Sequence, residues 1–339
     1  MSNHEWPPVS VVMPIYNEAA TIERSLRAML AQDYPGPVEV ICVDGLSDDG
    51  TREIVGRVAA EDPRVRLVSN PRRIIPAAMN IGFREARYGL VARMDGHTFA
   101  PPDYLRRCVE VLQESGAECV GGRWEYVADT YMARVIAAAM ESRFGVGPGR
   151  WRGAKEAGEA DTVPYGLWVR DRVLALGGFD ETLLVNEDYE LAYRLRQAGG
   201  RIYYSPDIRT DYHPRRSLKA LWKQYFRYGF WKARMLRMHP RSVRLRHVVA
   251  PLFVVGLVAG AVLSFFGSLW RWLYGLALAA YALLVLFFSL RQAARHGWRV
   301  LPLLPFAFAT LHLAWGAGFL KGVWRWWIRR DDEQEESGA

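Results

Sequence analysis

The sequence has only three cysteines, and they form no recognisable pair. No Cys-x-x-Cys spacing occurs among Cys42, Cys108 and Cys119. The sequence therefore indicates neither a disulfide framework nor a thiolate zinc site. The N-terminus lacks a basic segment followed by a short apolar stretch, which predicts that no cleavable signal peptide is present. We therefore expect the first domain to stay in a reducing compartment, the cytosol.

Acidic residues are in the minority. The chain has 36 Asp and Glu against 44 Lys and Arg, a net charge of +8, and 50% of its 339 residues are hydrophobic. That hydrophobic fraction supports a sizeable core and argues against disorder. The positive excess suits phosphate-bearing ligands, anionic lipid or nucleic acid, and its location along the chain must decide among them.

Charged residues are absent from three runs near the C-terminus, residues 248–266, 272–290 and 301–320. Each run has about twenty residues, enough to cross a hydrocarbon core of about 30 Å. Tryptophans flank the runs, as they do at membrane–water interfaces. Buried helices of a second soluble domain are the alternative interpretation, but three adjacent runs of this length favour membrane spans.

The topology of the third run stays open. Arginines precede the first run and separate the second from the third, which places both loops in the cytosol. Three crossings would then leave the tail outside, although basic residues such as Lys321 and Arg325 favour the cytosol. Either the third segment is re-entrant, interrupted by Pro302 and Pro305, or the first two loops decide the topology.

The first two hundred residues alternate short apolar runs with longer amphipathic stretches, which is typical of βαβ units. The expected strands are residues 9–15, 38–43, 65–68 and 90–94; the expected helices include residues 75–87 and one that Thr51 caps. Glu18, Asp44 and Asp95 each follow one of these strands. Since ligands of open α/β sheets gather at the carboxyl ends of strands, we expect a site there.

Two groups of residues are candidates for chemistry. Asp95 and His97 follow a strand at a spacing of two and could face one divalent ion, although an isolated Asp-x-His also occurs as an ordinary turn. Glu187 and Asp188 begin a predicted helix. They could simply stabilise its N-terminus, or one of them could act as a general base. Spacing alone does not choose between these interpretations.

Taken in order, the segments of this chain resemble glycosyltransferase family 2. The resemblance rests on residues 9–18, 43–51, 95–97, 177–181, 187–188 and 224–228, and it covers residues 9 to about 230. Within the family the chain is most similar to bacterial exopolysaccharide enzymes of the succinoglycan-synthesis type. The resemblance implies an α/β fold, a GT-A (Rossmann-like) nucleotide-sugar-binding domain, followed by an α-helical transmembrane region.

We expect a catalytic domain at 1–213, a basic amphipathic interfacial helix region at 214–246, a transmembrane region of about three segments at 247–328, and a charged tail at 329–339.

The resemblance also implies a donor site and a metal site. Pro14, Tyr16, Glu18 and Asp44 would hold the nucleotide base and ribose, with uridine expected. Asp95 would bind the donor diphosphate through Mg²⁺ or Mn²⁺, with His97 as a second ligand where the family usually has a second Asp. An Asp-x-His version is found in the related polypeptide N-acetylgalactosaminyltransferases. His213 is a candidate third ligand, although a His before Pro is also an ordinary turn residue.

The remaining implied roles concern the transfer itself. Asp188 matches the family's catalytic base, with Glu187 as a neighbour that positions the base or the acceptor. Gln224 and Arg227 resemble the Gln-x-x-Arg-Trp motif of processive members and would contact the donor diphosphate. Tyr228 replaces the Trp of that motif, which leaves processivity open.

The expected function is that of a membrane-anchored inverting glycosyltransferase of exopolysaccharide or cell-surface glycan synthesis. It would transfer a sugar from a nucleoside-diphosphate donor to a polyprenyl-diphosphate-linked saccharide at the bacterial cytoplasmic membrane, with the catalytic domain in the cytosol. Membrane lipids and other glycan-assembly proteins are expected partners. The basic, aromatic stretch before the apolar runs suits anionic lipid better than nucleic acid. Direct transfer onto polyprenyl phosphate and an inactive membrane scaffold are the alternatives.

Overall fold

The computed structural model describes residues 6–147, 149 and 154–329 and divides into two compact units. The first unit is Met1–Glu125 with Gly149–Tyr212, and the second is Tyr126–Pro148 with His213–Ala339. The first unit thus ends one residue before the predicted boundary at 213. Residues 126–148, which the sequence analysis placed in the catalytic domain, group with the second unit. Apart from Arg329, the predicted tail at 329–339 lies outside the described residues.

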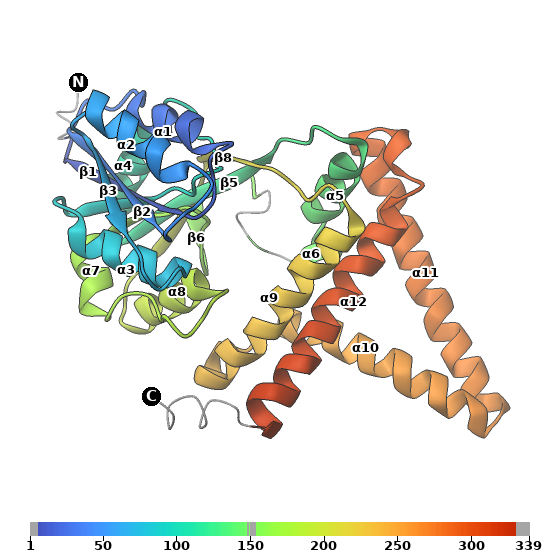
Figure 1. Ribbon diagram of the computed structural model, residues 1–339. Coiled ribbons are helices and arrows are strands. Elements are labelled where there is room, and N and C mark those ends of the chain that lie inside the picture. The colour runs from blue at the N-terminus through green and yellow to red at the C-terminus, as the bar shows by residue number, and fades with distance from the viewer. Residues whose placement is uncertain (1–5, 148, 150–153, 330–339) are drawn as a thin grey trace. The chain divides into compact units, whose positions relative to one another are not determined.

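The first unit is a mixed eight-stranded sheet with helices on both faces (Figure 1). The strand order is β3-β2-β1-β4-β7-β5-β8-β6. The strands are β1 (Val9–Ile15), β2 (Val38–Asp44), β3 (Val65–Ser69), β4 (Leu90–Arg93), β5 (Cys119–Tyr126), β6 (Gly158–Glu159), β7 (Leu167–Val169) and β8 (Ile202–Tyr212). The helices are α1 (Ile22–Leu30), α2 (Thr51–Glu61), α3 (Ile75–Glu85), α4 (Tyr104–Ser115), α7 (Arg170–Ala175) and α8 (Glu187–Gln197).

The four predicted strands and the predicted helix at 75–87 are confirmed to within two residues at each end. Strands β3, β2, β1 and β4 run parallel, whereas β7 is antiparallel to β4 and to β5. Parallel strands are covered on both faces and therefore read as continuous apolar runs rather than as alternating ones. β1 is such a run, and every one of its residues is buried.

Alternate side chains of β1 enter two different cores. Val11 and Met13 pack with α1, α2 and α4 on one face of the sheet. Val12 packs with α3, α7 and α8 on the other face. The sheet therefore holds six helices in two layers, and its strand ends are fixed from both sides.

One local prediction was wrong. Thr51 does not cap α2, because Gly50 occupies the N-cap position and no side chain makes a cap bond. Thr51 is instead the first residue of the helix, and its hydroxyl accepts a hydrogen bond from the backbone N–H of Glu18 at 2.8 Å. Thr51 thus connects two neighbouring loops of the sheet edge.

The second unit is helical. Its helices are α5 (Tyr131–Glu141), α6 (Arg143–Val146), α9 (Leu218–Met238), α10 (Leu245–Leu263), α11 (Ser268–His296) and α12 (Leu304–Val323), followed by a π-helical turn at Trp324–Arg329. Among the described residues, two helices are long and apolar enough to cross a membrane, Leu245–Phe266 and Ser268–His296. The third predicted span forms α12, which is not one of these two helices, and a third crossing stays a prediction.

Helices α9 and α12 pack along each other over most of their length (Figure 1). Three glycines make this approach possible. A Cβ atom on Gly318 would lie 2.0 Å from the carbonyl oxygen of Phe226, and one on Gly229 would lie 2.2 Å from that of Trp315. A Cβ atom on Gly322 would meet the Phe230 carbonyl oxygen at 2.5 Å. The predicted basic helix is therefore anchored to the third apolar segment through backbone contact.

A Gly318→Ala variant is expected to destabilise the second unit by at least about 2 kcal/mol, since the new methyl group overlaps a backbone carbonyl that no rotamer change can move. Gly275→Ala in α11 is the matched control, because a Cβ atom there meets nothing within 4 Å. Removing a helix glycine at an open position stabilises by up to about 1 kcal/mol. The check is thermal unfolding of both variants in detergent. Equal unfolding midpoints for the two would contradict the close packing of α9 on α12.

Candidate active site

Loops at the carboxyl ends of β1 and β2 are tied to each other. The two strands pair in register, so that Ile15 lies beside Asp44. Asn17 then bridges to the second loop, where its backbone N–H donates to Ser47 Oγ at 2.9 Å and its side-chain amide donates to Asp48 Oδ1 at 2.9 Å. Asn17 has φ 54°, in the left-handed region that Asn tolerates better than most residues. These hydrogen bonds give the first loop a defined shape.

Asp44 is fully buried at the end of β2. Its carboxylate accepts from Arg52 Nη1 at 2.6 Å, from the Ser47 backbone N–H at 3.0 Å and from Ser47 Oγ at 2.5 Å. A carboxylate with this many donors is compensated for its burial. In this arrangement it shapes the turn after β2, and direct nucleotide contact by Asp44 stays a prediction.

Two other predicted nucleotide residues, Pro14 and Tyr16, lie at the carboxyl end of the neighbouring strand β1. Pro14 is buried within β1 beside Val43, and Tyr16 is 47% exposed at the end of that strand. A Cβ atom on Gly45 would lie 3.1 Å from the Tyr16 ring, so the ring packs against the second loop. Of these residues, Tyr16 presents the flat, accessible surface on which a base could stack.

The turn after β4 carries Asp95 and His97. Nδ1 of His97 lies 2.8 Å from Glu18 Oε1, and the His97 side chain is 55% exposed. The hydroxyl of Ser25 on α1 donates a hydrogen bond to the Thr98 carbonyl at 2.7 Å and so ties the turn to α1. The structure thus brings Glu18 and His97 together, from the ends of β1 and β4.

Asp95 points elsewhere, to Arg93. The guanidinium Nε donates to Asp95 Oδ1 at 3.0 Å, and Nη1 of the same group donates to Glu187 Oε1 at 3.1 Å. Burial alone would lower the pKa of Arg93, but the charges of Asp95, Glu187 and Asp188 outweigh it and raise that pKa above its ordinary value. Arg93 therefore stays charged and joins the two predicted acidic groups of the site.

Glu187 and Asp188 begin α8, as predicted. Asn186 occupies the N-cap position with φ 67° and makes no side-chain cap bond. Glu187 is 7% exposed. Its burial raises its pKa to about 7, the charge of Asp188 adds to this, and Arg93 opposes it. Asp188 is only partly buried, and its Oδ1 accepts from the Tyr189 backbone N–H at 2.7 Å. Asp188 is thus the more accessible of the two carboxylates, and its role as the base stays a prediction.

Comparison with known proteins identifies the family. Residues 10–158 match the model described as Glycosyl transferase family 2, and residues 90–321 match Glycosyl transferase family group 2. The chain is 34% identical to Succinoglycan biosynthesis protein ExoA of Rhizobium meliloti (strain 1021), over 94% of this chain and 96% of that one. The chain belongs to glycosyltransferase family 2.

Two further relatives of this glycosyltransferase extend the comparison. Glycosyltransferase AglE of Haloferax volcanii is 30% identical over 74% of this chain and 82% of that one. Mannosyltransferase PcManGT from Pyrobaculum calidifontis, solved in complex with GDP-Man and Mn2+, superposes with a TM-score of 0.66. It is 23% identical, with 95% of this chain and 88% of that one covered. The first unit thus has the predicted GT-A fold.

A divalent cation fits the chemistry of this glycosyltransferase's donor set. No three His, Cys, Asp or Glu side chains assemble as a ligand set within the part of the chain that the structure describes. However, Mg²⁺ is usually held by one or two protein side chains while substrate phosphates complete its shell. Asp95 and His97, which pair in this structure with Arg93 and with Glu18, are a carboxylate and an imidazole, a combination that also suits Mn²⁺. Three carboxylates around a single guanidinium leave an excess of negative charge that a cation would offset.

His213, Gln224 and Arg227 belong to the second unit. His213 and Arg227 are exposed. Gln224 accepts from Arg215 Nε at 3.2 Å and donates to the Tyr228 hydroxyl at 2.9 Å. The tyrosine that replaces the expected Trp is therefore a hydrogen-bond partner of the motif's own glutamine. Roles for these three residues at the donor site stay predictions.

Two residues of the site were missed from the sequence. Arg93 reads as an ordinary strand residue, and Tyr165 has no motif. Tyr165 has φ 45°, a conformation that is costly for a residue with a large side chain, and such residues gather at functional sites. Its hydroxyl accepts from Thr98 Oγ1 at 3.1 Å, and burial and then the charge of Asp95 raise its pKa. The signal available in advance was the position of Arg93, two residues before the acidic turn.

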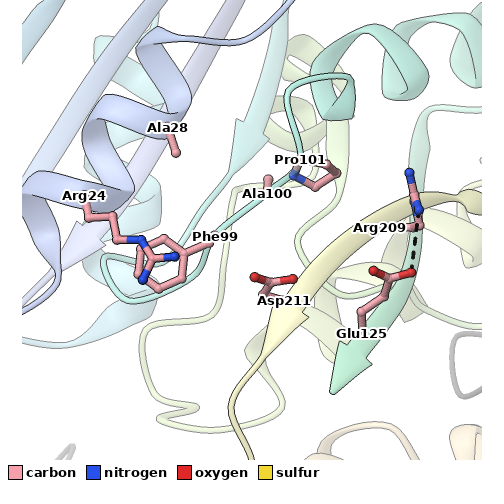
Figure 2. A pocket seen from close by; sticks show the side chains of 8 residues that line it. All are labelled: Arg24, Ala28, Phe99, Ala100, Pro101, Glu125, Arg209 and Asp211. Atoms are coloured by element: carbon pink, nitrogen blue, oxygen red, sulfur yellow. Dashed lines mark ion pairs between the residues drawn. The ribbon is translucent and has the colours of Figure 1, made fainter. Parts of the chain in front are cut away.

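A polar cavity of about 360 Å³ lies between α1 and residues 99–101, the segment that follows the turn of Asp95 and His97 (Figure 2). The guanidinium of Arg24 stacks over the Phe99 ring at 4.1 Å, and Arg209 pairs with Glu125 at 3.8 Å. The cavity also includes Asp211, whose backbone N–H donates to the Phe99 carbonyl at 2.8 Å. Its charged groups balance in sign and number, so we assign the cavity no part in the transfer.

Glu187 is expected to make the glycosyltransferase less stable as the pH rises. The pKa of Glu187 in the folded protein, about 7, lies above the ordinary value of 4.5. Its contribution to the stability of the fold is therefore fully present below pH 4.5 and is lost as the pH rises through 7. A difference of this size corresponds to about 3 kcal/mol at most. A Glu187→Gln variant should lose this pH dependence, measured as the thermal midpoint between pH 5 and 8. The control is Glu53→Gln, an exposed residue in the first turn of α2, which should follow the wild type. Parallel curves for Glu187→Gln and wild type would contradict the expected shift.

Proposed function

We propose that this family 2 glycosyltransferase transfers a sugar from a nucleoside-diphosphate donor, with uridine as the first base to test, to a hydroxyl of a polyprenyl-diphosphate-linked saccharide. The observation that carries the proposal is the position of Asp188, partly accessible at the start of α8, where the neighbouring Glu187 is joined through Arg93 to the turn of Asp95. A hydroxyl acceptor needs a base, and this carboxylate is available for that role.

Asp188 takes the proton of the acceptor hydroxyl. The hydroxyl oxygen then attacks the anomeric carbon from the face opposite the diphosphate, the bond from that carbon to the diphosphate oxygen breaks, and the configuration inverts in one displacement. A divalent cation held by Asp95 and His97 would supply positive charge to the departing diphosphate. Tyr16 and the loops after β1 and β2 hold the nucleotide. Arg227 and Gln224 are proposed to contact the diphosphate, and His213 to complete the cation site.

The names of relatives support this choice of donor and acceptor. One relative, 25% identical over 68% of this chain and 74% of that one, is a Methanococcus voltae transferase named for a dolichyl N-acetyl-alpha-D-glucosaminyl phosphate acceptor. Succinoglycan biosynthesis appears in the name of another, and the solved mannosyltransferase holds GDP-Man and Mn2+. These names favour a nucleotide-sugar donor and a lipid-linked acceptor in glycan synthesis.

The second unit is proposed to anchor the enzyme in the bacterial cytoplasmic membrane as a multi-pass protein, with the first unit in the cytosol. The two long apolar helices support this, because most of their large side chains are exposed. An exposed apolar surface of this extent in water would be an aggregation hazard, whereas lipid accommodates it. The face of α9 with Lys219, Trp222 and Lys223 is exposed and suits anionic lipid headgroups.

The test is nucleotide release by the purified full chain with Mn²⁺ and a lipid-linked saccharide. UDP-glucose, UDP-galactose, UDP-N-acetylglucosamine and GDP-mannose form the donor panel. Turnover that requires both a donor of this panel and the saccharide acceptor supports the proposal. Equal turnover with bare polyprenyl phosphate would replace it with direct transfer onto the lipid phosphate. No turnover under any of these conditions, with a folded protein, would support an inactive scaffold.

A further inference from the structure

Arg93 spans two parts of the chain that are far apart in sequence. It lies at the end of β4, where its Nε donates to Asp95 Oδ1 at 3.0 Å and its Nη1 donates to Glu187 Oε1 at 3.1 Å. The three side chains are largely buried, with exposed fractions of 12% for Arg93, 17% for Asp95 and 9% for Glu187. Arg93 is therefore a direct link between the turn after β4 and the start of α8.

The shape of the guanidinium matters for this link. Its planar fork presents several N–H donors in fixed directions, so that one group serves two carboxylates at once. A lysine ammonium is a point charge at the end of a flexible stem and cannot span both carboxylates with the same geometry. Replacing Arg93 should therefore uncouple the turn after β4 from the start of α8.

Asp188 is adjacent to Glu187 and shares its local backbone. Its charge also acts on Arg93. Fixing Glu187 thus fixes the first turn of α8, and with it the direction of the Asp188 carboxylate. On the other side, the same guanidinium restrains Asp95, which precedes His97 by two residues.

We propose that Arg93 is a positioning residue that sets the donor turn of Asp95 and the base-bearing start of α8 in one fixed arrangement. Arg93 contacts neither the acceptor hydroxyl nor the anomeric carbon in this role. The inference rests on the proposed function, because it assumes that Asp95 serves the donor and Asp188 the acceptor.

The experiment compares Arg93→Met and Arg93→Lys with Arg194→Lys in the full-length protein. Arg194 is a suitable control because it is also a partly buried arginine of the first unit that forks between a carboxylate, Glu190, and backbone carbonyls. Its partners belong to α8 and to the loop before it, and not to the turn of Asp95. A general loss of buried charge pairing should affect Arg194→Lys as much as the Arg93 variants.

For Arg93→Met we expect kcat at saturating donor and Mn²⁺ to fall about 100-fold, because small misplacements of reacting groups cost this much. Binding of Mn²⁺ with UDP or GDP, measured by calorimetry without acceptor, should weaken about 10-fold, as for other residues that orient ligating groups.

Arg93→Lys should recover the binding to within about 3-fold while kcat stays about 10-fold low. Arg194→Lys should lower the thermal midpoint but keep kcat and nucleotide binding within about 3-fold. Wild-type kcat and binding in a folded Arg93→Met protein would overturn the proposal, as would an Arg194→Lys protein with the same losses.

A second measurement needs no turnover. In thermal unfolding, Arg93→Met should leave Glu187 buried without a partner, so the double variant Arg93→Met/Glu187→Gln should unfold at a higher temperature than Arg93→Met alone. If the shifts of the unfolding midpoint in Arg93→Met and in Glu187→Gln simply add up to the shift in the double variant, the link between the two residues would be overturned. If the wild type shows no transfer but the double variant recovers stability, the proposed function fails while the link through Arg93 stands.

Discussion

Asp188→Asn is expected to lower transfer by about 10³-fold, since general-base catalysis typically contributes 10²- to 10⁴-fold. The amide has nearly the shape of the carboxylate and can keep the hydrogen bond from the Tyr189 backbone N–H. It cannot take a proton from the acceptor hydroxyl. Donor binding should therefore change by less than about 3-fold, because the base does not contact the nucleotide. The measurement is kcat at saturating donor, together with calorimetric nucleotide binding.

The control for this substitution is Asp171→Asn. Asp171 is also in the first turn of a helix, α7, but its side chain is 83% exposed. It should leave transfer unchanged. Activity within 10-fold of wild type for Asp188→Asn would remove Asp188 from the role of base. Loss of nucleotide binding together with activity would indicate instead that Asp188 supports the donor site.

Chelation of divalent cations with EDTA is expected to reduce turnover by about 10³-fold, because removing even one preorganised donor that stabilises developing negative charge costs 10²- to 10³-fold. Added Mn²⁺ or Mg²⁺ should restore the activity. The structural reason is the surplus of carboxylates, since Asp95, Glu187 and Asp188 surround the single guanidinium of Arg93. A diphosphate approaching this region needs further positive charge. Turnover that EDTA leaves intact would exclude the cation from the reaction.

His97→Ala tests the ligand assignment within the same experiment. It should raise the Mn²⁺ concentration needed for half-maximal activity about 10-fold or more, as expected for loss of a first ligand or its support. His296→Ala is the control, because that histidine pairs with Glu141 in the second unit. An unchanged Mn²⁺ requirement in His97→Ala would remove His97 from the cation site.

The strands and the sheet edge were predictable because their signals are local. Short apolar runs bounded by polar turns mark β1 to β4, and the carboxyl ends of parallel strands lie at one edge of a sheet, where Glu18, Asp44 and Asp95 were expected. The start of α8 was equally legible, since carboxylates gather in the first turns of helices.

Other features depend on pairs of residues far apart in the chain. The contact from Arg93 to Glu187 joins residues separated by 94 positions, and no periodicity or motif announces it. The burial that raises the pKa of Glu187 likewise arises from packing between segments that are distant in sequence. The Gly318 contact with Phe226 is another case, since the sequence marks both helices but not the face on which they meet.

The sequence by itself determined the α/β catalytic domain, the order of the motifs, the family resemblance and the apolar character of the C-terminal region. Each of these follows from composition or from patterns within a short stretch of chain. Only the tertiary structure decided that Glu187 is held by Arg93 while Asp188 remains accessible, and that the third apolar segment packs on the basic helix through glycines. Burial and charge pairing are properties of neighbours in space, and a linear pattern does not specify which distant side chains become neighbours.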